Sequence, residues 1–149
     1  MSLLDQIQKH QIAAQKQRDE LVLSTLRLLT AEIHNHEIDK HAPLTDEEVE
    51  KIISQQIKKR QEATQLYRQG NRPELAQREE KEAQVLSKYL PPQMSPEELT
   101  QTIRKIIKDQ EVNDPVNFGQ VMKQVMSEVK GRAPGDKIAT LVKQFLSQA

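Results

Sequence analysis

The sequence predicts an all-α protein made of an N-terminal unit of long amphipathic helices and a C-terminal unit of three helices. Three observations lead to this prediction. Apolar residues recur at three- and four-residue steps, which is the period of an amphipathic helix. Cap residues followed by proline or acidic residues mark helix starts. Only 36% of the 149 residues are hydrophobic and 3% are aromatic, which suffices for thin cores between helices but not for one large core.

Residues 2 to about 17 form the first expected helix, which is polar and has its apolar side chains near its start. Asp19 is a suitable N-cap for a second helix. The apolar residues of that helix step by four, three and four: Val22, Leu26, Leu29 and Ile33. The two segments are equally compatible with one continuous helix. We expect this part to end near Lys40, before Pro43.

The next helix has the clearest start in the chain. Thr45 is followed three residues later by Glu48, which is the pattern of a capping box. The apolar period then continues to Gly70, a residue suited to the C′ position. We expect the exposed face of this helix to carry a basic run, Lys58, Lys59 and Arg60.

Pro73 is suited to the first turn of a fourth helix. Residues 77–82 are almost wholly charged or polar, so we expect two solvated turns there. The apolar residues around this stretch can still reach a core, and we place the end of the first domain at residue 90.

Residues 91–96 are expected to be a proline-rich linker, because adjacent prolines cannot continue a helix. Residues 97–149 then form the second domain. Ser95 caps its first helix and Glu98 completes a Ser-x-x-Glu pattern. The segment Asn113-Asp114-Pro115 repeats the cap-then-proline signal before the second helix. A turn at Gly131 leads into the third helix.

Composition excludes several classes of function. Lys+Arg and Asp+Glu are both 22, so no overall basic field indicates nucleic acid. The chain has no cysteine, which rules out thiolate catalysis and cysteine metal sites. It shows no glycine-rich phosphate loop, and His34 and His36 are spaced so that they point to different faces of a helix. We therefore predict no catalytic, cofactor-binding or metal-binding residues, no cofactor and no membrane partner.

No targeting or membrane-spanning segment is apparent, so a cytoplasmic location is expected.

The basic residues around the glycine turn are the first candidates for binding. Flexible cations and backbone N–H groups at a turn suit a phosphate backbone. These candidates are Lys123, Lys130, Gly131, Arg132 and Lys137. The alternative is structural: Lys130 balances the negative end of its helix while Arg132 pairs with Asp136. The second candidate surface is the run Lys58, Lys59 and Arg60, for which a solvated charged face is the alternative.

Several stretches match one family in order and spacing. They are Leu-Ser-Thr-Leu-Arg-Leu-Leu at 23–29, Pro-Leu-Thr-Asp-Glu-Glu-Val at 43–49, Tyr-Leu-Pro-Pro-Gln-Met-Ser-Pro-Glu-Glu-Leu at 89–99, Phe-Gly-Gln-Val-Met at 118–122 and Val-Lys-Gly-Arg-Ala at 129–133. On these residues the chain resembles the YqeY-like proteins of the GatB/YqeY family across essentially its whole length. One departure is Pro134, where the family commonly has an acidic residue followed by glycine. Proline removes an N–H that could donate to phosphate.

The resemblance implies an all-α, two-part architecture. It also implies that the C-terminal part is similar to the tail domain of the B subunit of the tRNA-dependent amidotransferase. That enzyme converts misacylated Glu-tRNA or Asp-tRNA to the amide with glutamine as nitrogen donor, and its tail helps to hold the tRNA. Related modules are appended to some glutaminyl-tRNA synthetases. The resemblance supplies no active site, because the chemistry of the B subunit lies in a separate domain.

Three hypotheses follow. The first is a non-catalytic tRNA-binding accessory module of tRNA amidation or aminoacylation, with an aminoacyl-tRNA synthetase or amidotransferase complex as partner. The second is an amidotransferase-like carbon-nitrogen ligase that uses glutamine as amido-nitrogen donor within a complex. The third is a helical protein-protein adaptor. We do not expect catalysis by the chain on its own.

Overall fold

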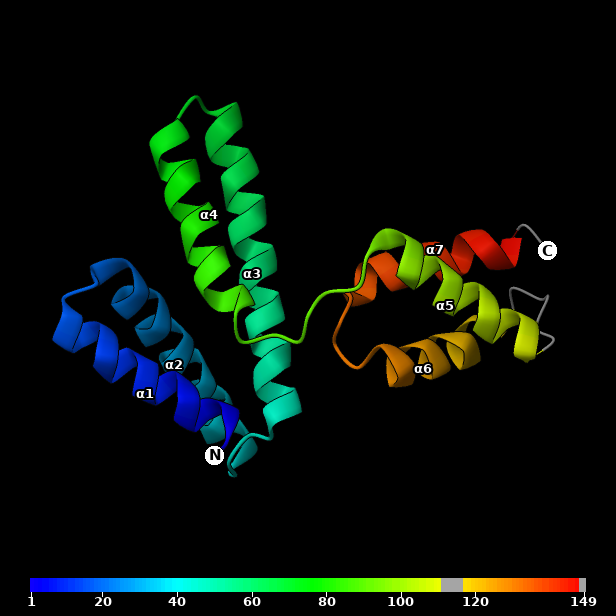
Figure 1. Cartoon of the computed structure of the whole chain (residues 1–149), viewed down its shortest axis with the longest axis horizontal. Helices are drawn as coiled ribbons and strands as arrows, with labels where there is room; N and C mark the ends of the chain where they lie inside the picture. Colours follow the sequence, from blue (N-terminus) through cyan, green and yellow to red (C-terminus); the bar gives the residue numbers. More distant parts are fainter. Residues whose placement is uncertain (111–116, 148–149) are drawn as a thin grey trace. The chain divides into compact units, whose positions relative to one another are not determined.

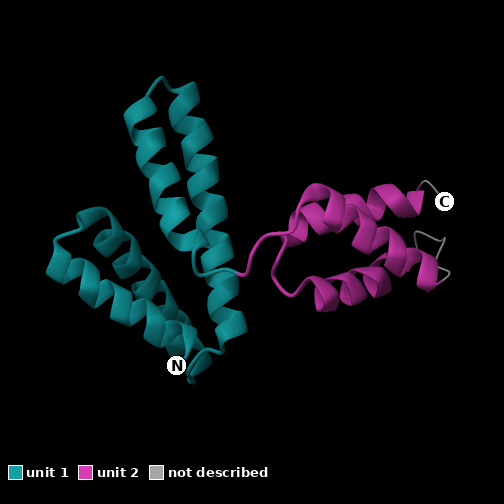
Figure 2. Cartoon of the chain, viewed as in Figure 1, with its two compact units in different colours: residues 1–90 teal, residues 91–149 magenta. Residues whose placement is uncertain are grey.

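A computed structural model describes residues 1–110 and 117–147 and shows only helices as regular structure in them (Figure 1). This confirms the prediction of an all-α fold. The helices are α1 (Leu3–Gln17), α2 (Glu20–Lys40), α3 (Asp46–Gln69), α4 (Pro73–Ser87), α5 (Pro96–Asp109), α6 (Phe118–Val129) and α7 (Gly135–Ser147). The chain divides into two compact units, Met1–Leu90 and Pro91–Ala149 (Figure 2).

The first unit consists of two helical hairpins, α1 with α2 and α3 with α4 (Figure 1). The core is built from the apolar stripes of α1, α2 and the first half of α3, together with the end of α4. Its buried residues are Leu3, Ile7, Leu26, Leu29, Ile33, Val49, Ile52, Ile53 and Leu86. The turn between α3 and α4 lies away from the α1–α2 hairpin.

The caps set the helix boundaries of this unit. Asp19 Oδ1 accepts a hydrogen bond from the Val22 N–H at 3.3 Å, and Arg18 has φ 58, so α1 and α2 are two helices and not one. Thr45 and Glu48 form the predicted capping box: the Thr45 hydroxyl accepts from the Glu48 N–H, and the Glu48 carboxylate accepts from the Thr45 N–H, both at 3.2 Å. These local signals were sufficient to place the helix starts.

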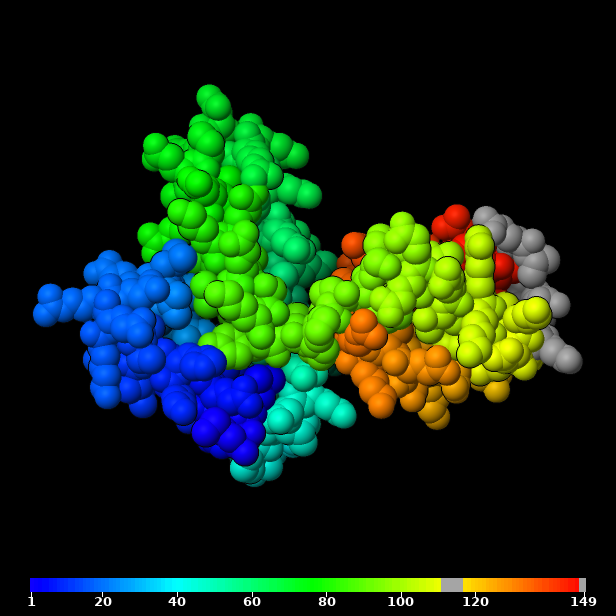
Figure 3. Space-filling view, viewed as in Figure 1, coloured from blue at the N-terminus to red at the C-terminus, as the bar shows by residue number. Residues whose placement is uncertain are grey.

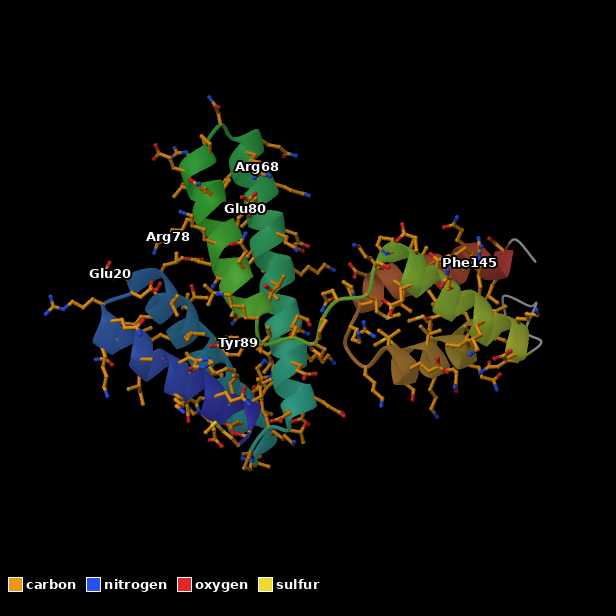
Figure 4. All side chains as sticks on the ribbon, viewed as in Figure 1. Glu20, Arg68, Arg78, Glu80, Tyr89 and Phe145 are labelled. Carbon is orange, nitrogen blue, oxygen red and sulfur yellow. The ribbon has the colours of Figure 1, made fainter. Side chains whose placement is uncertain are left out.

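The turn between α3 and α4 uses a different residue from the expected one. Gly70 has φ −80, whereas Asn71 has φ 59. The left-handed position therefore falls on Asn71, and asparagine tolerates that conformation better than most residues. Pro73 opens α4 as predicted. Close to this turn, Arg68 of α3 contacts Glu80 of α4, and both residues are labelled in Figure 4.

Charged side chains join α3 to α4 further along the hairpin. Arg60 of α3 lies 3.3 Å from Glu79 Oε2 and also contacts Glu82, both on α4. Arg78 Nε lies 3.2 Å from the other Glu82 oxygen. The side chains of Arg60 and Glu82 are only 12% and 9% exposed. We call Arg60, Arg78, Glu79 and Glu82 the ion-pair seam.

The expectation of two solvated turns over 77–82 holds for the three exposed residues Gln77, Arg78 and Lys81. It fails for Glu79, Glu80 and Glu82, because these carboxylates face arginines of α3.

The second unit packs α5, α6 and α7 around an apolar core. Its most deeply buried members are Leu99, Ile103, Ile106, Val121, Val125, Val129, Ile138, Val142 and Leu146. Figure 3 shows the face of this unit that α5 and α6 cover. Ser95 caps α5, its hydroxyl accepting from the Glu98 N–H at 3.1 Å, and Pro96 is the first residue of the helix. The predicted cap at 113–115 lies outside the described residues.

Candidate nucleic-acid interface

The turn after α6 reverses the chain through two left-handed residues. Lys130 has φ 49 and Gly131 has φ 77. The Lys130 N–H donates to the Met126 carbonyl at 3.2 Å, and the Arg132 N–H donates to the Val129 carbonyl at 3.1 Å. Glycine has no steric cost at a positive φ, which explains its place between the two basic residues. The turn thus has a defined backbone and presents Lys130 and Gly131 to solvent.

Arg132 ties this turn to the segment before α5. Its Nε–H donates to the Pro92 carbonyl at 2.9 Å, and its own carbonyl accepts from the Met94 N–H at 2.8 Å. Its Nη2 lies 3.6 Å from Glu98 Oε1. Residues 92–94, which we expected to be part of a linker, are therefore held against the second unit.

These contacts change the interpretation of Arg132. The structural alternative from the sequence gave it a partner in Asp136, and the structure adds contacts of its side chain with Pro92 and Glu98. Its side chain is still 39% exposed. Because the guanidinium already holds the turn in place, we regard Arg132 first as a positioning residue.

The three lysines of the candidate surface are exposed. Lys123 lies on α6 about two turns before Lys130, and Lys137 lies in the first turn of α7. The Lys137 N–H donates to Asp136 Oδ1 at 3.0 Å. A carboxylate at the start of α7 competes with any other anion for the backbone N–H groups there, and Pro134 has no N–H to donate. Binding of phosphate at this surface would therefore depend on the ammonium groups.

The second candidate surface loses one member. The Arg60 guanidinium faces α4 in the ion-pair seam and is largely buried, whereas Lys58 and Lys59 are exposed on α3. Consecutive residues on a helix point in different directions, so a basic run need not lie on one face. We therefore leave Arg60 out of any binding surface.

Titratable groups elsewhere form separate pairs. His34 Nδ1 lies 3.1 Å from Glu37 Oε1, and His36 Nε2 lies 3.4 Å from Glu32 Oε1. Among the residues that the structure describes, no group of three or more His, Asp or Glu side chains could hold a metal ion. Within the same residues, no helix is long and apolar enough to cross a membrane.

Two contacts between cations and aromatic rings were not predicted from the sequence. Arg104 Cζ of α5 lies 4.9 Å from the centre of the Phe145 ring on α7, and Lys143 Nζ lies 5.5 Å from the centre of the Phe118 ring. The sequence contains one hint of these contacts, since both phenylalanines of the chain fall in its second half. Which cation covers which ring depends on how the helices pack, and spacing along one helix does not reveal it.

Comparison with known proteins gives one family and several curated relatives. The model of a family described as "Yqey-like protein" matches residues 4–146. Altered inheritance of mitochondria protein 41 of Clavispora lusitaniae is 29% identical over 117 residues, which cover 74% of this chain and 68% of that protein. The protein of the same name from Pyrenophora tritici-repentis is 28% identical over 122 residues, covering 80% and 67%. An uncharacterised protein of Schizosaccharomyces pombe is 33% identical over 85 residues, covering 57% and 69%.

Proposed function

We propose that this chain, which belongs to the YqeY-like protein family, is a non-catalytic tRNA-binding module that works beside an enzyme of tRNA amidation or aminoacylation. The proposed contact is the surface formed by Lys123, Lys130 and Lys137 of the second unit. Lys58 and Lys59 of the first unit are proposed as further contacts. A cytoplasmic location is part of the proposal, and the mitochondrial names of some relatives concern those proteins.

One observation carries the proposal. Lys130 projects from a turn whose backbone is fixed on both sides, by its own hydrogen bonds and by the Arg132 contacts to Pro92 and Met94. Lys123 and Lys137, from the helices on either side of the turn, are exposed as well. A rigid turn with flexible ammonium groups suits a phosphate backbone, which is bound through charge and not through base sequence.

The choice of tRNA over other nucleic acids rests on the resemblance of the C-terminal part, residues 97–149, to the tail of the amidotransferase B subunit. The structure contributes the exposure of the lysines and the positions of their helices. The absence of a net positive charge implies that binding is local and moderate, since no long-range field steers the ligand.

Binding of the full chain to total tRNA and to double-stranded DNA, measured across a salt series, tests the proposal. We expect preference for tRNA and an affinity that falls as salt rises. The double variant Lys130→Ala, Lys137→Ala should bind on the order of tenfold more weakly, with a salt dependence that is shallower by about one unit of slope per lost phosphate contact. Lys9→Ala, an exposed lysine of α1, is the control and should change neither quantity.

Failure of the wild-type chain to bind tRNA at low salt would overturn the proposal. The adaptor hypothesis is then the second candidate, and the exposure of Leu66 and Leu75 favours it. These side chains are 67% and 40% exposed near the turn of the α3–α4 hairpin. An adaptor predicts protein partners that persist in a pull-down after nuclease treatment and are lost with Leu66→Ser.

A further inference from the structure

Both phenylalanines of the chain lie in the second unit, and each carries a cation over its ring. Each ring is partly buried against the core. Arg104 and Lys143 are exposed on the outer side of these rings. The two contacts differ in chemistry. A guanidinium is planar and stacks on aromatic faces, whereas an ammonium is a compact point charge with no face to offer.

Phe145 gives the Arg104 guanidinium a support. The ring lies on α7, beside α5, and its position is marked in Figure 4. With the guanidinium held at 4.9 Å from the ring centre, Arg104 loses fewer conformations when a second flat group stacks on it. An exposed side chain that is already oriented is a pre-organised contact.

A shallow depression adjoins Arg104 on the surface of α5. It is lined by Pro96, Glu97, Thr100, Gln101 and Arg104. The Thr100 hydroxyl and the Gln101 amide offer hydrogen-bond donors and acceptors of the kind that pair with base edges. The Glu97 carboxylate repels a phosphate at this place but accepts hydrogen bonds from the amino groups of bases. The lining therefore favours a nucleobase over a phosphate group.

We propose that Arg104, held over the ring of Phe145, binds one unpaired RNA base, with Thr100 and Gln101 at the edge of that base. The inference rests on the proposed tRNA binding and names the part of the RNA that this unit reads. A base inside a duplex has both faces covered, so only an unpaired base can stack on a side chain. In this arrangement Lys130 and Lys137 contact the phosphate backbone of the RNA, and Arg104 over Phe145 contacts one of its bases.

The distance between the two contacts is compatible with one strand. Lys137 and Phe145 lie on the same helix, α7, and their positions are separated by about 12 Å along the helix axis. A stacked strand advances about 3.4 Å per nucleotide, so that length corresponds to roughly three or four stacked nucleotides and to fewer nucleotides of an extended strand. A single RNA segment can therefore reach both places on the second unit.

The test uses the full chain and two probes: an unpaired oligoribonucleotide that carries 2-aminopurine, and the same strand in a duplex. Arg104→Lys keeps the charge but removes the flat group, and Phe145→Leu keeps an apolar side chain but removes the ring. Each should weaken binding of the unpaired probe by roughly fivefold or more, as expected for loss of one stacking contact. Each should also reduce the quenching of 2-aminopurine fluorescence on binding. Affinity for the duplex and the slope of the salt dependence should stay unchanged.

Phe118→Leu is the matched control, because the cation over the ring of Phe118 is an ammonium and not a flat guanidinium. This variant should change neither the affinity for the two probes nor the quenching of 2-aminopurine. Unchanged affinity and quenching in Arg104→Lys would overturn the platform, as would an equal loss for the unpaired probe and the duplex. In both cases tRNA binding that still depends on Lys130 and Lys137 would leave the proposed function standing. No binding of tRNA by the wild-type chain would overturn both proposals. Arg104 is exposed, so its variant reports on binding even where Phe145→Leu destabilises the unit.

Discussion

The two units use charged residues in opposite ways. In the first unit, arginines and glutamates of α3 and α4 face one another in the ion-pair seam, where Arg60 and Glu82 are largely buried between the two helices. In the second unit, α5, α6 and α7 meet through apolar side chains. There the lysines of the candidate surface are exposed, and two other cations lie over aromatic rings.

The difference shows that basic residues in a sequence are not equally available to a ligand. Arg60 belongs to the most basic run of the chain, Lys58-Lys59-Arg60, yet its charge is used to hold two helices together. Lys130 has fewer basic residues next to it in the sequence, but it lies at an exposed turn. The location of a charge relative to the helix interface therefore matters more than the local density of charge.

Breaking the seam has the largest expected effect. Arg60→Ala leaves the buried Glu82 carboxylate with Arg78 as its remaining partner. Loss of one member of a buried ion pair costs about 3–5 kcal/mol, and the remaining contact places the expected loss at the lower end of that range. Urea unfolding of the full chain measures the loss. Arg68→Ala is the control, because its pair with Glu80 is largely exposed and should contribute less than about 1 kcal/mol.

A double replacement sharpens this test. Arg60→Met combined with Glu82→Leu removes both charges and supplies apolar contact, so its stability should be close to that of the wild type. Equal destabilisation by the single and the double variants would show that the seam acts through its shape and not through pairing of charge.

The next largest loss of stability is expected from a substitution in the apolar core of the second unit. Ile103 is fully buried on α5, and Ile103→Ala should cost about 2–5 kcal/mol through lost burial and the cavity that remains. Hydrogen exchange locates the effect. We expect reduced protection in α5, α6 and α7 and unchanged protection in α1 to α4. A uniform loss across all of these helices would contradict a separate core for this unit.

The helix caps should give smaller and similar effects in both units. Thr45→Ala and Ser95→Ala each remove one hydroxyl that accepts from a backbone N–H, and each should cost about 1 kcal/mol. Thermal unfolding followed by circular dichroism compares them. A loss much larger for Thr45 than for Ser95 would show that the reciprocal bond from Glu48 adds to the cap.

The smallest effect concerns pH. Hydrogen bonds from Lys40 and from the Thr45 N–H hold the pKa of Glu48 below its ordinary value. A carboxyl with a lowered folded-state pKa stabilises the fold above its unfolded pKa, and this contribution is lost as the pH falls through the folded value. The stability difference between wild type and Glu48→Gln should therefore shrink as the pH drops below the ordinary pKa of glutamate. A difference that stays constant in acid would show that the charge of Glu48 is unimportant.

The sequence revealed the parts of the fold that depend on near neighbours. Thr45 with Glu48, Asp19 and Ser95 cap the helices as predicted, because a cap involves residues only three positions apart. The seam was missed, because a charged residue shows the same pattern whether it faces water or an opposite charge on another helix. Periodicity indicates which residues share one face of a helix, but it does not indicate whether that face contacts water or another helix.

The same limit applies to the candidate site. The exposure of Lys130 follows from its place after the last apolar residue of α6. The contact of Arg132 with Pro92, by contrast, joins residues 40 positions apart and has no local signature. Arg104 over Phe145 is likewise a contact between two helices. Positions of this kind become visible only when the helices are placed against one another.

Ultraviolet crosslinking of bound tRNA to the full chain, followed by peptide mapping, shows which unit of the protein contacts the tRNA. We expect the strongest crosslinks in the second unit, in peptides that contain Lys130 and Lys137, and we expect them to diminish in the Lys130→Ala, Lys137→Ala variant. Crosslinks confined to residues 1–90, or equally strong in that variant, would contradict the claim that the second unit holds the tRNA.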